Sequence, residues 1–411
     1  MKILVSAFAC WPGVGAEPGN GWNLCAGLAR RGHRVHCLTQ PRAREKLRHH
    51  PLPPGLSFSF VGLPGRLEIS GRSIPGGEQA GYVAWQYAAF LEARRCHRKT
   101  PFDLAHHISL GSLQMGSFLY KLSIPLIFGP AGGGQIAPRT LKSVMGRGWA
   151  REQLRTLVSN FMLRFHPGCR NLLTSARVIL AANHPTLKMA GRWRHGRRGL
   201  LPMLDTALPA PIAPVDTTRQ RYQGPALRLL WVGGIVPRKG LGLCLEVMKT
   251  LSHLPDIQLT VVGDGPQAAS LLKRGSRQGN VHWMGWQPHH RLREIYAGHH
   301  VFFFTSLRDS GPSQLMEAMS HGLPVVTLDL NGQADMVRPG TGFRCPPSNP
   351  ALTRAQLRQA IMTLHRDRDV LQTMGVRAAD WAHQHIWPRR IHQFETLYQE
   401  VLKDPLPCKH P

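Results

Sequence analysis

The residues best suited to chemistry lie between positions 307 and 326, in the stretch LRDSGPSQLMEAMSHGLPVV. Asp309 precedes a Ser-Gly-Pro turn, and Glu317 follows eight residues later in a predicted short helix. A helix start behind such a turn offers backbone N–H groups and a positive dipole end to an anion. Two carboxylates at this spacing are too distant to act as a retaining pair on one bond. They suit two hydroxyl-bearing ends of one ligand; the alternative is a loop acid and a helix-surface acid.

Hydrophobic runs on both sides place this stretch in a sheet. VFFFTS ends just before it and VVTLD overlaps its end, and each is typical of a buried parallel strand. From residue 227 further runs, LRLLWVGG, IQLTVVG and NVHWMG, alternate with helical patterns such as 240–252. This alternation predicts a doubly wound parallel sheet, with the two acids at the carboxyl end of one strand.

Within these strands, the stretch resembles the Glu-x7-Glu region of the family 4 retaining glycosyltransferases, which have the GT-B fold. In that family the first carboxylate meets the donor sugar, the turn amides meet the diphosphate and the second carboxylate binds the ribose. The resemblance implies a catalytic role for Asp309, which replaces the family's glutamate and is one methylene shorter. It implies donor contacts by Ser310, Gly311, Ser313 and Glu317.

Other turns in this half carry the same resemblance. GGIVPRKG resembles the family's G-R-x-x-x-x-K-G, whose Arg and Lys hold the diphosphate. Lys239 matches the lysine, Gly234 occupies the arginine position, and Arg238 is a neighbouring cation. The turns that line the base and ribose in relatives correspond to Gly263, Asp264 and Gly265, and to Gly285-Trp286. The alternative role for these residues is turn formation, which Gly and Asp serve well.

The amino terminus predicts a strand at 2–7, a glycine-rich loop at 8–21 and a helix to Arg31. A dinucleotide site is not expected there, because G-x-G-x-x-G is missing and no acid ends the next strand, RVHCLT. The resemblance implies that this loop, and the triple glycine after PLIFGPA, approach the donor phosphates and the acceptor. The residues are Gly13, Gly15, Glu17, Gly19 and Gly133; a tight structural turn is the equal alternative for the glycines.

Two adjacent histidines, His106 and His107, end the predicted strand in FDLAHHISLGS. Neighbouring strand residues point to opposite faces, so at most one of them can point into a binding cleft. Many members of the resembled family place a donor-contacting histidine here, which implies His107. A hydrogen-bonded histidine at a strand end is the equal alternative.

The chain of 411 residues is strongly basic, with a formal net charge of +28. Residues 1–205 hold 28 basic and 8 acidic side chains, whereas residues 206–411 hold 23 and 15, so the excess lies in the first half. Such an excess indicates an anionic partner. Nucleic acid is not expected, because no reader motif accompanies the basic stretches 42–48 and 188–199.

The predicted helix 149–166 is basic and amphipathic, with Leu154, Val158, Phe161 and Phe165 on one face. Taken alone it is an ordinary domain helix; together with the charge it indicates docking on an anionic inner-membrane surface. No apolar run approaches the length of a membrane span, and MKILVSAFAC predicts a strand rather than a signal. Eight scattered cysteines without a C-x-x-C pair indicate a reduced, cytoplasmic protein. The basic charge adds the expectation that it is peripheral on the inner face of the membrane.

The resemblance covers nearly the whole chain and implies two Rossmann-like, doubly wound parallel-sheet domains facing a central cleft. The expected divisions are 1–205 (acceptor domain), 206–225 (linker), 226–386 (donor domain) and 387–411 (a helix crossing back to the first domain). AEPGNGW and GPAGGG are similar to a bacterial surface-polysaccharide branch.

The expected activity is retaining, metal-independent sugar transfer from a nucleoside diphosphate sugar to a glycan or lipid-linked acceptor, without a cofactor. Asp367-Arg368-Asp369 lies in a charged helical stretch and is not expected to bind metal. The alternatives are a nucleotide-sugar epimerase of the same fold and a non-catalytic basic homologue that binds anionic partners.

Overall fold

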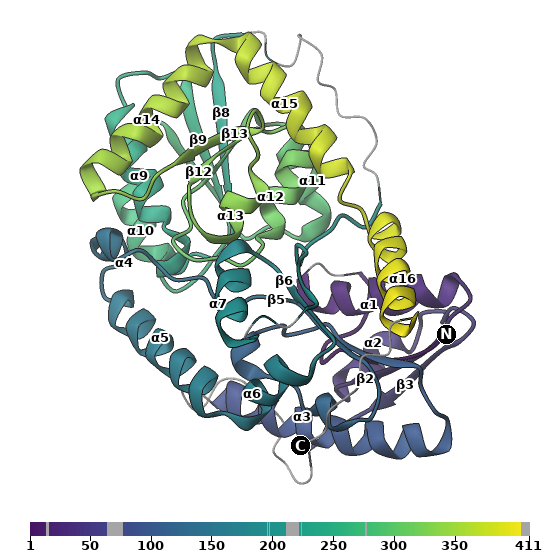
Figure 1. Cartoon of the computed structure of the whole chain (residues 1–411). Coiled ribbons are helices and arrows are strands. Elements are labelled where there is room, and N and C mark those ends of the chain that lie inside the picture. Colours follow the sequence, from purple (N-terminus) through teal and green to yellow (C-terminus); the bar gives the residue numbers. More distant parts are fainter. Residues whose placement is uncertain are drawn as a thin grey trace. The chain divides into compact units, whose positions relative to one another are not determined.

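The structure is a computed structural model that describes residues 1–13, 16–63, 77–194, 196, 198–210, 222, 224–275 and 278–403. The chain forms two compact units (Figure 1). Unit 1 comprises Met1–Gly134, Leu157–Pro209 and Trp387–Pro411, and unit 2 comprises Gln135–Thr156 and Ala210–Ile386. Each unit is built on one parallel sheet with helices packed against it.

Unit 1 has a seven-stranded sheet in the order β3-β2-β1-β4-β5-β6-β7. Its strands are β1 (Lys2–Ser6), β2 (Arg34–Thr39), β3 (Leu56–Phe60), β4 (Leu104–His107), β5 (Leu126–Ala131), β6 (Val178–Ala181) and β7 (Leu200–Pro202). Its helices are α1 (Ala16–Arg30), α2 (Arg42–Leu47), α3 (Gly77–Lys99), η1 (Leu113–Met115), η2 (Phe118–Lys121), α6 (Pro167–Ser175), α7 (His184–Arg194) and α16 (Trp387–Lys403). Helix α5 (Gly148–Phe165) begins in unit 2 and ends in unit 1.

The unit 1 sheet is buried on both faces. One hydrophobic core lies between the sheet, α1 and α16, and a second lies between the sheet, α3, α6 and α7. Helix α16 packs closely on α1 because Gly27 has no side chain: a Cβ there would lie 2.6 Å from Cγ1 of Ile391. Burial on both faces explains why strands such as β5, LIFGPA, carry no polar alternation.

Unit 2 has a six-stranded sheet in the order β10-β9-β8-β11-β12-β13. Its strands are β8 (Leu227–Val232), β9 (Ile257–Val262), β10 (Val281–Gly285), β11 (Val301–Phe304), β12 (Val325–Leu328) and β13 (Gly342–Cys345). Its helices are η3 (Arg139–Leu141), α4 (Lys142–Met145), η4 (Pro237–Lys239), α9 (Leu241–Thr250), α10 (Ala268–Gly275), α11 (His289–Ala297), α12 (Ser313–Ser320), α13 (Asn331–Met336), α14 (Pro350–Arg366) and α15 (Arg368–His383).

The structure departs from the expected domain boundaries at residues 135–156. The sequence analysis placed them in the first domain, whereas they belong to unit 2. The physical reason is burial: Ala137, Leu141 and Met145 are part of the unit 2 hydrophobic core. The sequence shows that these residues are apolar, but it does not show in which of the two hydrophobic cores they are buried.

Both sheets reverse their strand order once, and this reversal marks where ligands bind in open α/β sheets. In unit 1 the chain runs from β1 outward to β3 and then returns to the other side of β1 as β4. In unit 2 the same reversal lies between β8 and β11. The loops that follow these four strands are therefore the first places to look for a site.

Among the helices in the described ranges, none combines the length and the apolar composition that a membrane span requires.

Candidate functional site

The loops after β8 and β11 meet at the switch point of unit 2. The Leu307 N–H donates a hydrogen bond to the Arg238 carbonyl at 2.8 Å, and the Ser306 hydroxyl donates to the same oxygen at 3.1 Å. Gly240 has a φ of +66°, and a Cβ there would lie 2.3 Å from the Thr305 carbonyl oxygen. Only glycine fits this position, and the contacts hold the two loops together.

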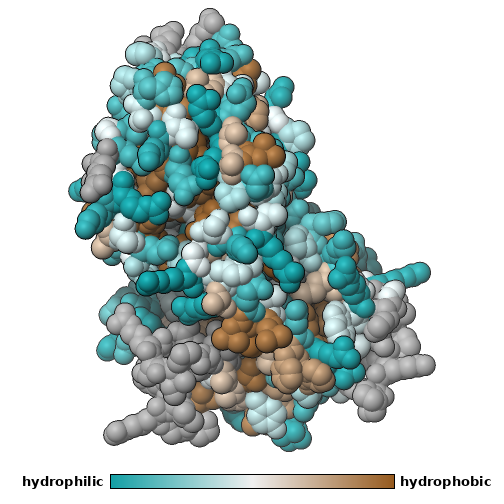
Figure 2. Space-filling model, turned by 90° about the vertical axis from the view of Figure 1, so that its left-hand side faces the viewer, coloured by the Kyte–Doolittle hydropathy of each residue, from teal (hydrophilic) through white to brown (hydrophobic). Residues whose placement is uncertain are grey.

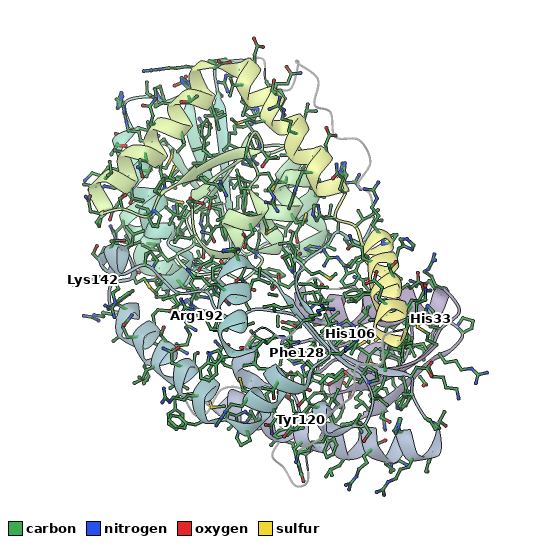
Figure 3. All side chains as sticks on the ribbon, in the orientation of Figure 1. His33, His106, Tyr120, Phe128, Lys142 and Arg192 are labelled. Atoms are coloured by element: carbon green, nitrogen blue, oxygen red, sulfur yellow. The ribbon has the colours of Figure 1, made fainter. Side chains whose placement is uncertain are left out.

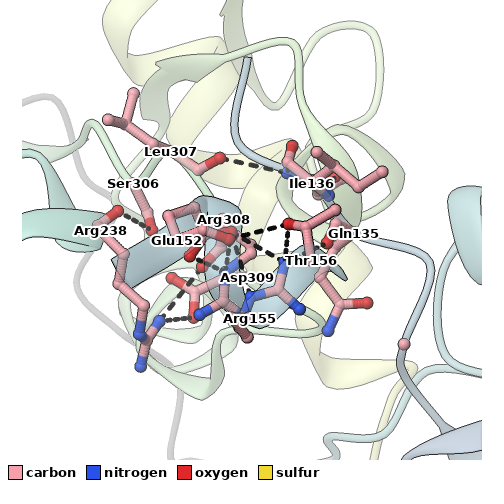
Figure 4. A network of polar contacts seen from close by, with 12 residues as sticks. Gln135, Ile136, Glu152, Arg155, Thr156, Arg238, Ser306, Leu307, Arg308 and Asp309 are labelled. Atoms are coloured by element: carbon pink, nitrogen blue, oxygen red, sulfur yellow. Dashed lines mark hydrogen bonds and ion pairs between the residues drawn. The ribbon is translucent and has the colours of Figure 1, made fainter. Parts of the chain in front are cut away.

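Asp309 lies between two cations at this point. Its Oδ2 is 2.8 Å from Lys239 Nζ. Its Oδ1 is 2.7 Å from Arg238 Nη1 (Figure 4). Burial alone would raise the pKa of Asp309, but Lys239 and Arg238 outweigh it and hold that pKa below its ordinary value. Burial lowers the pKa of Lys239, although the attraction of Asp309 opposes this effect. The structure thus brings together three residues that the sequence had singled out.

A second carboxylate, Glu152 of α5, is shared by two arginines. Its Oε1 lies 2.9 Å from Arg308 Nε and 2.8 Å from Arg155 Nη2. The Arg308 carbonyl accepts a hydrogen bond from Arg238 at 3.1 Å, so this group joins the Asp309 group in one network (Figure 4). Four cationic side chains share two carboxylates, which leaves an excess of two positive charges. Such an excess complements a diphosphate.

Three members of this network, Glu152, Arg155 and Arg308, were not expected from the sequence. Glu152 lies 156 residues before Arg308, and its contact depends on α5 beginning in unit 2. The signal in the sequence was a single acid in an otherwise basic helix.

The turn at Ser310 and Gly311 is supported by the start of α13, which the sequence analysis also missed. The Gly332 N–H donates to the Asp309 carbonyl at 3.2 Å, and Gln333 Nε2 donates to the Ser306 carbonyl at 2.6 Å. A Cβ on Gly332 would lie 1.3 Å from the Ser310 carbonyl oxygen. The Asn-Gly pair after VVTLD was the signal for this close approach.

Helix α12 begins at Ser313, directly after this turn and four residues after Asp309. The N–H groups of its first turn have no partner within the helix. Glu317, one turn into the helix, accepts a hydrogen bond from the Tyr296 hydroxyl at 3.1 Å. Burial raises the pKa of Glu317 above its ordinary value. The predicted ribose ligand is therefore an oriented, partly desolvated carboxylate.

The turns that were predicted to line the nucleotide base follow β9 and β10, at the carboxyl end of the same sheet. Gly263 has a φ of +139°, and a Cβ there would lie 1.9 Å from the Gly233 carbonyl oxygen. The Asp264 carboxylate accepts from the Gly265 N–H at 2.7 Å, and the Asp264 carbonyl accepts from the Ile235 N–H at 2.8 Å. These residues thus form a turn that joins the ends of β8 and β9. Trp286, after β10, is 70% exposed.

Gly234 has open space around it, since a Cβ there would meet no atom within 4 Å. The position that holds an arginine in the resembled family is therefore wide enough here for a side chain. The second cation beside Lys239 is Arg238, which also contacts Asp309.

The donor contact expected for His107 is not supported by the structure. His106 and His107 are both fully buried in unit 1 and, as neighbours on a strand, point to opposite sides of β4. His106 lies inside unit 1 beside α16 (Figure 3), where its Nδ1 is 2.5 Å from the Tyr398 hydroxyl. The His107 ring nitrogens lie 3.0 Å from the Tyr82 hydroxyl and 3.1 Å from the Ser117 hydroxyl. Burial lowers the pKa of His107 to about 3. The ring is therefore a satisfied, neutral core group, which agrees with the alternative of a hydrogen-bonded histidine at a strand end.

Unit 1 has a pocket at its own switch point, beside the residues that follow β1 and β4. Its polar and aromatic lining includes Glu17, Asn20, Asp205, Trp387 and Arg390. The Glu17 carboxylate accepts a hydrogen bond from the Leu110 N–H at 2.7 Å, and burial raises the pKa of Glu17. Leu110 has a φ of +50°, which is uncommon for leucine and marks local strain.

Helix α16 contributes Trp387 and Arg390 to the lining of this pocket. The Arg390 guanidinium donates to the Leu204 carbonyl, and Asn20 Nδ2 donates to the Asp205 carbonyl at 2.7 Å. The sequence singled out Glu17 and predicted that the helix at 387–411 crosses back to the first domain, but it did not indicate that Trp387 and Arg390 line a pocket with Glu17.

The predicted loop glycines have different positions. Helix α1 already begins at Ala16, so Gly19 lies in its first turn rather than in the loop 8–21; Pro18 is compatible with a helix start. Gly13 is exposed with a φ of +81°, and Gly15 lies outside the described residues. Gly133 has a φ of +137°, and a Cβ there would lie 2.3 Å from Gln114 Oε1.

Within the described ranges, one group of side chains has the spacing of metal ligands: Cys10, Cys25 and Cys37, whose Sγ atoms lie within 4.8 Å of one another. All three are buried in the unit 1 core between the sheet, α1 and α16. No disulfide forms among the described cysteines, which are all free.

Comparison with known proteins gives the site its context. Residues 226–367 match the family described as Glycosyl transferases group 1. The chain is 29% identical over 154 residues to N-acetyl-alpha-D-glucosaminyl L-malate synthase of Bacillus anthracis, covering 36% of this chain and 39% of that protein. It is 26% identical over 126 residues to the GPI3 component of phosphatidylinositol N-acetylglucosaminyltransferase of Saccharomyces cerevisiae, covering 30% and 28%. The chain thus spans less than half the length of these curated relatives.

Solved structures match over nearly the whole chain and establish the GT-B fold. Sucrose-phosphate synthase of Thermosynechococcus elongatus aligns with a TM-score of 0.68 at 18% identity, covering 98% of this chain and all of that one. WaaG, a glycosyltransferase involved in lipopolysaccharide biosynthesis, aligns with a TM-score of 0.59 at 16% identity, covering 96% and 99%. The two parallel sheets are the two Rossmann-like domains of this fold.

Proposed function

We propose that this chain, which carries a group 1 glycosyltransferase domain over residues 226–367, moves a sugar from a nucleoside diphosphate sugar to a hydroxyl group. The observation that carries the proposal is the charge network at the switch point of unit 2. Within the described ranges, this network consists of four cations, Lys239, Arg238, Arg308 and Arg155, paired with two carboxylates, Asp309 and Glu152, and the excess of positive charge complements a dianionic ligand.

The proposed role of this network is to stabilise the leaving diphosphate. Negative charge grows on the diphosphate as its bond to the sugar breaks, and fixed cations with N–H groups of the α12 start oppose that charge. Lys239 and Arg238 supply the cations, Asp309 contacts the donor sugar and Glu317 holds the ribose. Since side chains supply the positive charge, the reaction proceeds without a divalent metal.

The unit 1 pocket is the proposed acceptor site. Glu17 and Asn20 offer polar groups that suit sugar hydroxyls, and the indole of Trp387 offers an apolar wall to a sugar ring. The acceptor oxygen bonds to the anomeric carbon while the bond to the diphosphate breaks, and its proton passes to the departing diphosphate oxygen. Attack on the same face retains the anomeric configuration.

The proposed acceptor is a glycan or a lipid-linked glycan of a bacterial surface polysaccharide, met at the inner face of the cytoplasmic membrane. One relative is named for transfer to phosphatidylinositol, and WaaG is described as a lipopolysaccharide enzyme. The basic excess of the first half of the chain supports an acceptor that lies at an anionic surface.

The test is to incubate the purified chain with a panel of nucleoside diphosphate sugars in a metal chelator and to follow the products by NMR. Slow hydrolysis of one donor, with release of its nucleoside diphosphate and of a sugar that first appears in the donor's anomeric form, is expected. First appearance of the opposite anomer would overturn the retaining mechanism. An epimerised sugar would favour the alternative, a nucleotide-sugar epimerase of the same fold.

A further inference from the structure

Helix α5 presents its apolar side to solvent. Four residues of its unit 1 part are more than half exposed: Leu157 (67%), Val158 (51%), Phe161 (59%) and Phe165 (56%). We name these four the α5 face. The spacing of four residues from 157 to 161 and from 161 to 165 places them along one side of the helix.

The opposite side of the same helix is largely polar and faces inward. Glu152 and Leu163 are buried, and Thr156 and Ser159 are partly buried. A helix on the surface of a globular protein normally has the reverse arrangement, with its apolar side packed on the core. The amphipathic character that the sequence indicated is therefore real, but its apolar side is left uncovered.

The exposed apolar surface continues beyond α5 through ring contacts within unit 1. The ring centroids of Phe161 and Phe165 lie 4.7 Å apart. The ring centroid of Phe118 in η2 lies 6.1 Å from that of His166 and 5.5 Å from that of Tyr87 in α3. Figure 2 views the side on which α5 lies in Figure 1, and hydrophobic atoms gather in the lower half of that view. Contiguous apolar surface of this kind marks an interaction site.

Cations surround this surface. Arg164 lies over the Phe165 ring at 5.8 Å, and Lys121 lies over the Tyr87 ring at 5.9 Å. Between residues 81 and 200 the sequence has 18 lysines and arginines but only three acids. Two of those acids, Glu92 and Glu152, are already paired with arginines, so the charge offered to a partner is strongly positive.

We infer that the α5 face docks on a bilayer that contains acidic phospholipids. Phenylalanine and leucine side chains enter the interface between head groups and acyl chains, while arginine and lysine meet the phosphates. A second copy of the chain would bring the same basic surface against itself, which like charges oppose. The inference rests on the proposed function in one respect, since a lipid-linked acceptor explains why a sugar transferase would bind a membrane.

The test measures co-sedimentation of the full chain with vesicles of equal parts phosphatidylglycerol and phosphatidylcholine, and with vesicles of phosphatidylcholine alone. The wild type should bind the acidic vesicles, and the double variant Phe161→Ser/Phe165→Ser should bind them at least ~10-fold more weakly. Leu352→Ser, which removes a 48% exposed apolar side chain from α14 in unit 2, is the control and should bind as the wild type does.

Equal binding by the double variant, or no binding by the wild type, would overturn the inference. A dimer that the double variant converts to a monomer, without any change in vesicle binding, would instead show that a second copy covers the face. Nucleoside diphosphate binding in solution, measured on the same proteins, should be unchanged by both substitutions. If the wild type did not bind any nucleoside diphosphate, the proposed function would be refuted, whereas the result with vesicles would still hold.

Discussion

Replacing Lys239 with methionine removes one charge from the network and tests whether that charge holds a diphosphate. Lys239 Nζ lies 2.8 Å from Asp309 Oδ2, and its side chain is 7% exposed. A phosphate oxygen about 4 Å from Nζ would gain roughly 4 kcal/mol at an effective dielectric constant of about 20. Desolvation offsets part of this gain, and about 2–3 kcal/mol is typical of what remains for a charged hydrogen bond. The Kd for the nucleoside diphosphate should therefore rise roughly 30- to 150-fold.

Isothermal titration with the nucleoside, its monophosphate and its diphosphate gives the decisive comparison. The loss caused by Lys239→Met should grow with the number of phosphates, because only the phosphates meet the missing charge. Lys249→Met, on the exposed end of α9, is the control and should change none of the three affinities. A thermal melt of each variant establishes that it is folded. An equal loss for nucleoside and diphosphate would refute the assignment of Lys239 to the diphosphate.

Three further substitutions test the parts around this charge. Gly332→Ala should displace the turn at Ser310 and lower both the Tm and the nucleotide affinity, whereas Gly279→Ala, in open space, should change neither. Gly234→Arg adds a cation where space is open and should tighten diphosphate binding by up to about 5-fold; weaker binding would contradict this. Because burial raises the pKa of Glu317, Glu317→Gln should raise the Tm at about pH 8 but not below about pH 4, where the carboxyl is protonated in both states. It should also weaken nucleotide binding, and a Tm gain at both pH values would argue against the burial effect.

The sequence predicted the parallel sheets and those residues of the charge network that are close in the chain to a strand end. Lys239, Arg238 and Asp309 follow β8 and β11, and parallel strands that are neighbours bring such loops together. Strand order alone therefore determines much of this part of the site, once the alternation of strands and helices is recognised.

The parts that could not be predicted depend on long-range packing. Glu152 joins the network only because residues 135–156 pack in unit 2, and Arg390 reaches the unit 1 pocket only because α16 packs on α1. The sequence predicts that His106 and His107 point to opposite sides of β4, but it does not predict which residues cover each side. The histidine proved to be enclosed by Tyr82 and Ser117, which local pattern cannot show.

The orientation of α5 is a similar case. Its period of apolar residues is evident from the sequence, but the period does not say which side faces the protein. A buried glutamate on the polar side, held by two arginines, fixes that side inward and leaves the apolar side outward.

The most direct test of the central claim is titration of the wild-type chain with UDP, GDP, ADP and dTDP in the presence of a metal chelator. The charge network at the switch point of unit 2 predicts saturable binding of one of these nucleotides at a single site, with the diphosphate bound more tightly than its nucleoside. Absence of binding by all four, or binding that appears only after a divalent metal is added, would contradict the claim.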